Sequence, residues 1–275
     1  MLTWAFTAIP AISAMNATNA ADSGSATWIF LRGLTRESRH WGRFIAQFEA
    51  AIPASRVIAL DFPGNGLLNP QTSPLRVQDM VEHCRAQLNA MDIPPPYRLL
   101  AMSLGAMVAV AWCNRHPQEV STQVLINTSL RPFSKFYERL RPANYGVLLK
   151  LAVSGASPQA RERTILRITS NQPDHHATAG VLPCWLAWHQ ANPVSRANAF
   201  RQLVAAASFF APSTPPTAAT LLLASAQDRL VSVACSKALA SQWQCDVRIH
   251  PSAGHDLPLD DAAWVAQRVW DWLAR

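Results

Sequence analysis

The stretch LLAMSLGAMVAVAW, residues 99–112, carries one lone hydroxyl, Ser103, among apolar and small residues. A serine at a very tight turn between a strand and a helix is pushed into the open, where it can act as a nucleophile. Such a turn needs small residues two positions before and two after the serine, and Ala101 and Gly105 meet this need. Ala101 stands where glycine is more common. Ser103 is therefore the candidate nucleophile.

The Ser-x-Gly triplet is a weak signal by itself, because serine and glycine are common enough for one to arise by chance. It occurs twice here, at 103–105 and at 252–254. Only the first copy lies between an apolar strand pattern and a helical pattern. The alternative for Ser103 is a buried serine that bonds to its own helix.

A serine hydroxyl is a poor nucleophile without a base, and the base needs a carboxylate to orient it. Asp228 follows one apolar strand pattern, and His255 follows the next. The carboxyl ends of parallel strands meet at one edge of a sheet, so we expect both side chains on the same edge as Ser103. Two simpler alternatives remain: Asp228 caps the helix after it, and His255 lies in a surface loop.

Six apolar segments alternate with helical patterns along the chain. The strands are expected at 27–33, 56–66, 93–103, 121–129, 220–228 and 245–252. Continuous apolar strands that alternate with helices indicate an α/β fold, a mostly parallel sheet with helices on both faces. Residues 1–24 are expected to hold a further strand and a loose connection. The alternative is a cleaved signal sequence, although no Lys or Arg precedes the apolar stretch.

Residues 131–217 interrupt this alternation with helical stretches that are rich in proline and arginine. We expect an inserted helical lid there, and a core formed by 1–130 and 218–275. The segment has ten basic and three acidic residues, which account for the whole net charge of +7. Either these cations are simply solvated, or they attract an anionic substrate or an acidic partner. Trp185 and Trp188 either pack within the lid or line an acyl pocket.

Five short motifs carry a family resemblance: LRGL (31–34), DFPGNG (61–66), AMSLG (101–105), AQDRLV (226–231) and AGHD (253–256). With these motifs the chain resembles the α/β-hydrolase-fold serine hydrolases. The resemblance implies a catalytic triad of Ser103, Asp228 and His255, with no metal and no cofactor. It also implies an oxyanion hole formed by the backbone N–H groups of Leu34 and Leu104. The expected reaction is hydrolysis of a carboxylic ester through an acyl-serine intermediate.

One residue departs from the family pattern, which usually has histidine where this chain has Arg32. Arginine does not release its proton at working pH. We expect a structural role, such as an ion pair with Glu37; the alternative is a fixed charge that binds substrate. The basic lid is similar to that of the biotin-pathway esterases that cleave methyl esters on acyl carrier protein, which implies an acidic carrier protein as a partner.

Two other functions remain open: a binding protein on a hydrolase scaffold, and acyl transfer or thioester cleavage by the same triad. Five scattered cysteines without a Cys-x-x-Cys pair favour free thiols in a reducing compartment, so we expect a cytoplasmic protein. The longest apolar run is shorter than a membrane span. The basic segment lacks the broad stripe and interleaved aromatic residues typical of nucleic-acid binding.

Overall fold

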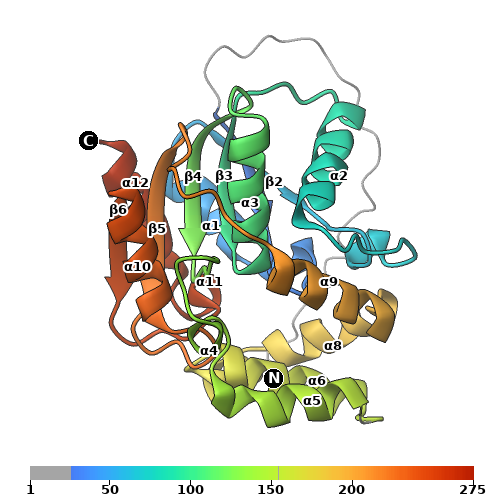
Figure 1. Cartoon of the computed structure of the whole chain (residues 1–275). Helices are drawn as coiled ribbons and strands as arrows, with labels where there is room; N and C mark the ends of the chain where they lie inside the picture. The colour runs from blue at the N-terminus through green and yellow to red at the C-terminus, as the bar shows by residue number, and fades with distance from the viewer. Residues whose placement is uncertain (1–25, 154) are drawn as a thin grey trace, which may run out of the picture.

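The computed structural model describes residues 26–153 and 155–275 (Figure 1). The strand expected within residues 1–24 lies outside this described part. Among the described residues, no helix is long and apolar enough to cross a membrane.

Six parallel strands form one sheet. In spatial order they are β2 (Ser55–Leu60), β1 (Ala26–Leu31), β3 (Tyr97–Met102), β4 (Val120–Ile126), β5 (Ala219–Ser225) and β6 (Asp246–His250). Every strand predicted within the described residues is confirmed. The predicted segments extend past most of these strands, because apolar and small residues continue into the loops at the carboxyl edge.

Helices cover both faces of the sheet, as the alternating pattern predicts (Figure 1). One face packs against α2 (Val77–Ala90), α3 (Leu104–Arg115) and α10 (Val233–Trp243). The other face packs against α1 (Phe44–Ala51) and α12 (Ala262–Leu273). Helices on both faces bury the central strands. In such sheets, ligands bind at the carboxyl ends of the strands.

Helix α2 illustrates how the sequence pattern fixes a helix on the sheet. Its buried side chains recur every three or four residues, which places them on one face. They are Val77, Met80, Val81, Cys84 and Leu88. The charged residues between them face outward, so α2 can pack in only one orientation.

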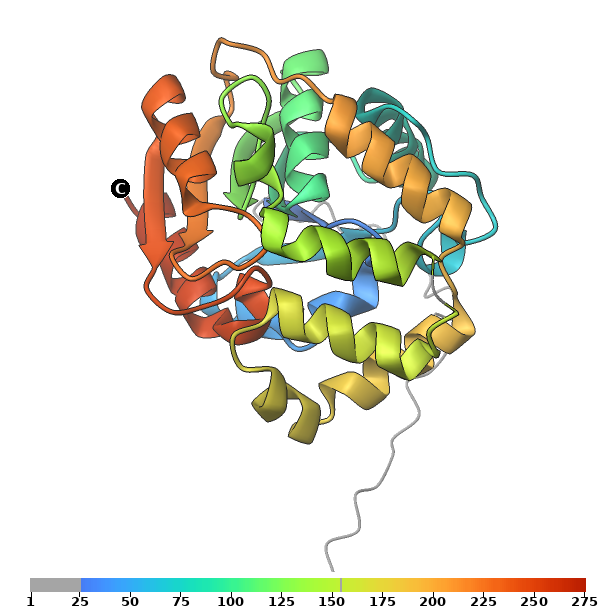
Figure 2. The ribbon, with the colours of Figure 1, turned by 60° about the horizontal axis from the view of Figure 1, so that its bottom comes forward.

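A helical segment lies between β4 and β5, at the carboxyl edge of the sheet (Figure 2). It contains α4 (Phe136–Arg139), η3 (Pro142–Asn144), α5 (Tyr145–Val153), α6 (Pro158–Thr169), α7 (Pro173–Thr178), α8 (Val181–Ala191) and α9 (Arg196–Ser208). We call residues 131–217 the inserted segment, and these bounds and its role as a lid remain predictions. Its helices form a small apolar cluster of their own around Trp185.

Candidate active site

Ser103 occupies a strained turn between β3 and α3. Its backbone has φ 55° and ψ −114°, a conformation that residues with a side chain rarely adopt. The N–H group of Ser103 donates to the carbonyl of Ile126, 3.1 Å away, which fixes the turn against β4. The side chain is partly exposed, whereas its neighbours Met102 and Leu104 are buried.

The small residues around Ser103 are needed because the β1 backbone crosses directly beneath the turn. A Cβ atom at Gly105 would lie 2.3 Å from the carbonyl oxygen of Leu31. At Gly33, the position of a Cβ atom is 3.3 Å from Ser103 Cβ and 3.8 Å from Ser103 Oγ. The loop after β1 therefore lies against the candidate nucleophile, as the tight-turn interpretation requires.

The predicted acid and base are in contact. His255 Nδ1 lies 2.7 Å from Asp228 Oδ2, and both side chains are almost fully buried. Because a carboxylate only accepts hydrogen bonds, the imidazole Nδ1–H donates and Nε2 is left as the basic nitrogen. This is the arrangement of an oriented general base.

Asp228 does not cap the helix after it. Its second oxygen, Oδ1, accepts hydrogen bonds from the N–H groups of Leu230 at 2.7 Å and Val231 at 2.9 Å. Helix α10 begins at Val233, and its N-cap is Ser232, whose side chain accepts from the Ala234 N–H. The loop after β5 therefore holds the carboxylate in place for His255.

Asn127 joins the three loops that carry Ser103, Asp228 and His255. It follows directly on Ile126, to which Ser103 donates, and its Oδ1 accepts from the Ser225 N–H at 2.8 Å. Its Nδ2 donates to the carbonyl of His255 at 2.8 Å. Asn127 was not predicted from the sequence. It nevertheless meets the criterion that selected Asp228, which is a polar side chain just after an apolar strand.

Ser103 and His255 lie on loops at the same edge of the sheet, after β3 and β6, which are separated by β4 and β5. No hydrogen bond joins Ser103 Oγ to His255 within residues 26–153 and 155–275. In enzymes without substrate such a bond is often long, and it shortens in the complex with substrate. The Asp–His half of the predicted triad is therefore in contact, and the approach of Ser103 to His255 remains a prediction.

The backbone N–H groups of Leu34 and Leu104, the two predicted oxyanion donors, can donate to a ligand. Within the described residues, neither the Leu34 N–H nor the Leu104 N–H donates to another protein group. Leu104 is the first residue of α3, where an N–H group has no partner within the helix. Leu34 directly follows Gly33, which touches Ser103. Two unpaired donors flanking a nucleophile can stabilise a developing negative oxygen.

Arg32 pairs with Asp256, and the expected ion pair with Glu37 is wrong. Arg32 Nη1 and Nη2 lie 3.1 Å and 2.6 Å from the two Asp256 oxygens. Glu37 is buried and pairs with Arg39 instead. The Arg32 guanidinium also stacks on Trp41, 4.7 Å from its ring centroid. A structural role is therefore shown for this side chain, while substrate binding remains untested.

The two tryptophans of the inserted segment differ in their surroundings. Trp185 is buried with Leu166 and Leu182, and Arg36 stacks on its ring at 4.1 Å. Trp188 is partly exposed and lines a small cavity of about 20 Å³ with His40 and Glu162. Packing within the inserted segment accounts for Trp185. Whether either ring contacts an acyl group remains a prediction.

Hydrogen bonds attach the inserted segment to the loops of the candidate triad. The carbonyl of Thr169 accepts from the Asp256 N–H at 2.7 Å, and that of Ser170 accepts from Arg229. Asp260, buried after the His255 loop, accepts from the N–H of Gly254 at 2.7 Å and from Ser170 Oγ. Burial opposes ionisation there, but the bonds from His176 and from these groups hold the pKa of Asp260 below its usual range.

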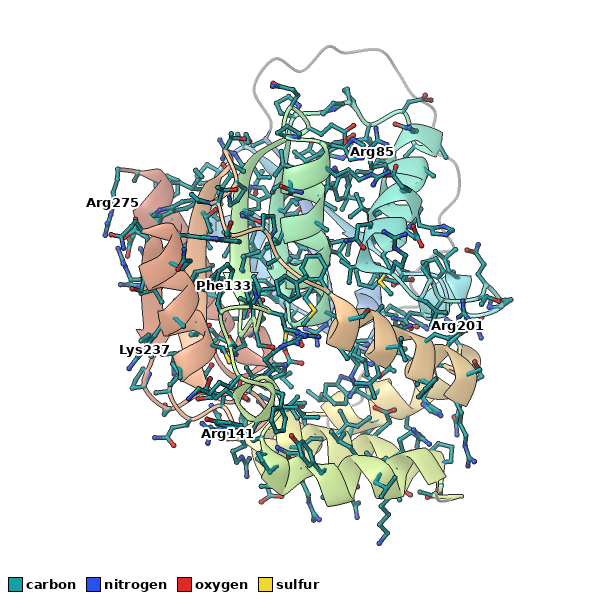
Figure 3. All side chains as sticks on the ribbon, in the orientation of Figure 1. Arg85, Phe133, Arg141, Arg201, Lys237 and Arg275 are labelled. Atoms are coloured by element: carbon teal, nitrogen blue, oxygen red, sulfur yellow. The ribbon has the colours of Figure 1, made fainter. Side chains whose placement is uncertain are left out.

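Several cations of the inserted segment are already engaged with the protein. Side chains that donate to backbone carbonyls include those of Arg131, Arg139, Arg161 and Arg201. In Figure 3, Arg141 and Arg201 lie at opposite sides of the segment. Three exposed cations on α5 and α6 have no bond to another described residue: Lys150, Arg163 and Arg167. These three remain available to a partner or substrate.

The described residues contain no group of three or more His, Cys, Asp or Glu side chains that could hold a metal ion. Their cysteines are free thiols, and burial raises the pKa of Cys235 and Cys245 to about 11. These two thiols are therefore protonated at neutral pH. The oxygen nucleophile Ser103 remains the candidate that the geometry favours.

Comparisons with known proteins bear on the family and the fold of the chain. Residues 28–268 match the family model described as "Alpha/beta hydrolase family". The biotin biosynthesis bifunctional protein BioHC of Teredinibacter turnerae (strain ATCC 39867 / T7901) is 32% identical over 102 residues. That match spans 37% of this chain and only 17% of the relative's length.

Two solved structures show how far the fold is shared. The enol-lactonase of Burkholderia xenovorans LB400 superposes with a TM-score of 0.75 at 15% identity, covering 93% of this chain and 94% of that one. A thermophilic esterase from Thermogutta terrifontis gives 0.71 at 19% identity, covering 91% and 90%. At this identity the likeness concerns the fold, whereas the family match spans most of the sequence. The chain belongs to the alpha/beta hydrolase family.

Proposed function

We propose that this protein is a serine hydrolase that cleaves a carboxylic ester through an acyl-serine intermediate. The observation that carries the proposal is a strained Ser103 turn at the same sheet edge as a histidine that is oriented by a buried aspartate. A non-glycine residue in this backbone conformation is costly and is retained where the surrounding structure enforces it, often at functional sites. The fold and the family of the chain support the same reaction class.

In the proposed reaction, Ser103 Oγ attacks the carbonyl carbon of the ester. Its proton passes to His255 Nε2, and the negative charge on the carbonyl oxygen is stabilised by the Leu34 and Leu104 N–H groups. The C–O bond to the alcohol then breaks, and His255 returns the proton to the leaving oxygen. Asp228 stabilises the charged imidazole while it holds this proton.

Hydrolysis is completed by water. His255 takes a proton from a water molecule, which attacks the acyl carbon, and the protonated imidazole then returns the proton to Ser103 Oγ. The same two N–H groups stabilise the second tetrahedral intermediate. Loss of one such donor costs on the order of 3 kcal/mol in enzymes with this arrangement.

The exposed cations of the inserted segment support an anionic substrate, or one carried on an acidic protein. Lys150, Arg163 and Arg167 are exposed on two helices at the sheet edge that carries Ser103. A concentration of one charge sign near a site raises the encounter rate with the opposite sign. The resemblance of the inserted segment to that of the biotin-pathway esterases that act on acyl carrier protein favours this substrate class, and the partly matching relative is a biotin biosynthesis protein.

The proposal is tested by comparing Ser103→Ala with Ser252→Ala on p-nitrophenyl esters of increasing chain length, with and without an acidic carrier protein. Ser252 belongs to the other Ser-x-Gly triplet and is its matched control. Ser103→Ala should lower kcat by roughly a millionfold if the triad acts as a unit. Ser252→Ala should keep wild-type activity.

Retention of full activity by Ser103→Ala contradicts the proposal. Absence of turnover in the wild-type protein over the whole panel favours a binding protein on a hydrolase scaffold instead. Product analysis with an added alcohol distinguishes hydrolysis from acyl transfer, because a transferase gives a new ester in place of the free acid.

A further inference from the structure

A buried ion pair connects two loops of the candidate active site. The guanidinium of Arg32 and the carboxylate of Asp256 meet through two parallel contacts of 3.1 Å and 2.6 Å. Each of the two residues is only 3% exposed. Among charged contacts in proteins, this bidentate geometry is the most directional.

The sequence positions of the two partners give the pair its significance. Arg32 directly follows β1 and lies two residues before Leu34, a candidate oxyanion donor. Asp256 directly follows His255, the candidate base. We propose that the Arg32–Asp256 pair positions the oxyanion loop and the base relative to each other. This inference rests on the function proposed above.

Neighbouring contacts restrict both partners to one arrangement. Arg32 stacks on Trp41, which packs against Phe30 in the core beneath the sheet. The N–H group of Asp256 donates to the carbonyl of Thr169 at the end of α6. Because Arg32 and Asp256 are both held by these contacts, the bidentate bond between them fixes the His255 loop relative to β1.

A contribution to folding stability does not by itself explain why a buried ion pair occupies this position. A buried ion pair loses so much hydration that apolar residues of similar volume often stabilise a protein as well or better. A directional contact between two catalytic loops, in contrast, places a donor and a base with an accuracy that apolar packing does not give. Errors of about 1 Å in such placement can cost roughly a hundredfold in rate.

The pair also balances charge around the imidazole. The charged and titratable groups around the His255 loop are Asp228, Arg229, Asp256, Asp260, Asp261, His250, His176 and Arg32. Asp256 is the next residue to the base, and Arg32 neutralises it. Removal of Arg32 alone leaves a buried negative charge there, and removal of Asp256 alone leaves a positive one. These two changes must affect protonation of the base in opposite directions.

The test is the pH dependence of kcat/KM for Arg32→Gln, Asp256→Asn and the double variant. In the plot of kcat/KM against pH, the rise on the acidic side is called the acidic limb. Arg32→Gln should move this limb to higher pH, and Asp256→Asn should move it to lower pH, each by on the order of one pH unit. Each single variant should lower kcat at least tenfold with little change in KM. The double variant should return the limb to its wild-type position.

Two further variants address simple loss of folding. Arg32→Lys keeps the charge but loses the bidentate contact, so it should lower kcat while leaving the limb in place. Arg43→Gln, which removes an exposed arginine with no side-chain bond to another described residue, should alter neither quantity. A limb that does not move in the single variants, or moves the same way in both, overturns the inference. So does a rise in KM for Arg32→Gln with kcat unchanged, because that result assigns Arg32 to substrate binding.

The two proposals fail separately. If Ser103→Ala keeps full activity, the proposed function itself is wrong. If Ser103→Ala is inactive while Arg32→Gln and Asp256→Asn keep the wild-type kcat and pH profile, the triad stands and only the positioning role is lost.

Discussion

At the scale of single residues, the account depends on how closely two backbones approach at Ser103. Gly33 and Gly105 bring the loop after β1 and the start of α3 into contact with the nucleophile turn. The strain at Ser103 is held by these contacts and by its bond to Ile126. The side chains around the turn therefore matter less for their chemistry than for their small size.

Gly105→Ala tests this close approach. The new Cβ atom would lie 2.3 Å from a backbone oxygen of β1, so strand and helix must separate. We expect a loss of a few kcal/mol in the free energy of unfolding, as for overpacked cores, together with lower esterase activity. Gly146→Ala is the matched control, because a Cβ atom there meets nothing within 4 Å. Equal denaturation midpoints for the two variants would contradict the close approach.

Asp61, at the end of β2, predicts a pH effect on stability. Burial is the main cause that raises its pKa to about 6, and nearby Glu37 adds to it. A carboxyl with a raised pKa in the folded state stabilises the protein at low pH, and this contribution is lost as the pH rises through about 6. Asp61→Asn mimics the protonated form, so its melting temperature relative to wild type should increase between pH 4 and pH 8. A difference that stays constant over this range would count against the burial of Asp61.

The candidate triad could be selected from the sequence more readily than the residues that support it. Ser103, Asp228 and His255 stand out because each polar side chain follows an apolar strand. Asp256 and Asn127 follow strands or motifs too, but nothing in a single sequence says which charge they meet. Arg32 was assigned to Glu37 because the two are close along the chain, whereas its partner lies more than two hundred residues away.

At the scale of secondary structure, the predicted strands were correct because buried parallel strands are continuously apolar. The inserted segment was predicted only as helical, since six short helices with few buried residues give weak periodicity. Its helix α6 proves to be an anchor. Glu162 near its beginning bonds Arg36 of the loop after β1, and Thr169 at its end bonds the His255 loop.

Glu162→Gln tests the anchor at α6. Glu162 is 2% exposed and lies 2.7 Å from Arg36 Nη1 and 3.1 Å from His189 Nδ1. Burial opposes its ionisation, but Arg36 and His189 hold the pKa of Glu162 below its usual range. Breaking one side of a buried pair costs about 3–5 kcal/mol. We expect a loss of this order in chemical denaturation.

The control for this anchor is a solvent-accessible charge cluster on α2. Glu82→Gln removes a partly exposed carboxylate that pairs with Arg85, Arg115 and His116, while Arg85 keeps its pair with Glu119. Its effect should stay below about 1 kcal/mol. If Glu162→Gln is no more harmful than Glu82→Gln, α6 does not hold the inserted segment in place through this pair.

At the scale of the whole molecule, the net positive charge lies in the inserted segment. The chain has a net charge of +7, and residues 131–217 account for all of it. The structure adds that part of this charge serves the fold, because several arginines bond to backbone carbonyls. These arginines keep their charge and add to the long-range field, whereas the exposed cations without a bond can also contact a substrate.

Salt dependence tests this attraction. For an ester with a carboxylate in its acyl chain, kcat/KM should fall as ionic strength rises from 0.01 M to 1 M, because screening shortens the reach of charges from about 30 Å to about 3 Å. A variant with Lys150→Gln, Arg163→Gln and Arg167→Gln should be slower at low salt and less sensitive to salt. A neutral ester of the same length is the control. An equal salt effect on both esters would contradict steering by the inserted segment.

The central claim is that Ser103 is a nucleophile activated by His255. The most direct measurement is mass spectrometry of the intact protein, and of its peptides, after treatment with a fluorophosphonate. We predict one adduct on Ser103 in the wild-type protein, much slower labelling in His255→Ala, and none in Ser103→Ala. A folded wild-type protein that stays unlabelled, or that is labelled at another residue, would contradict the account.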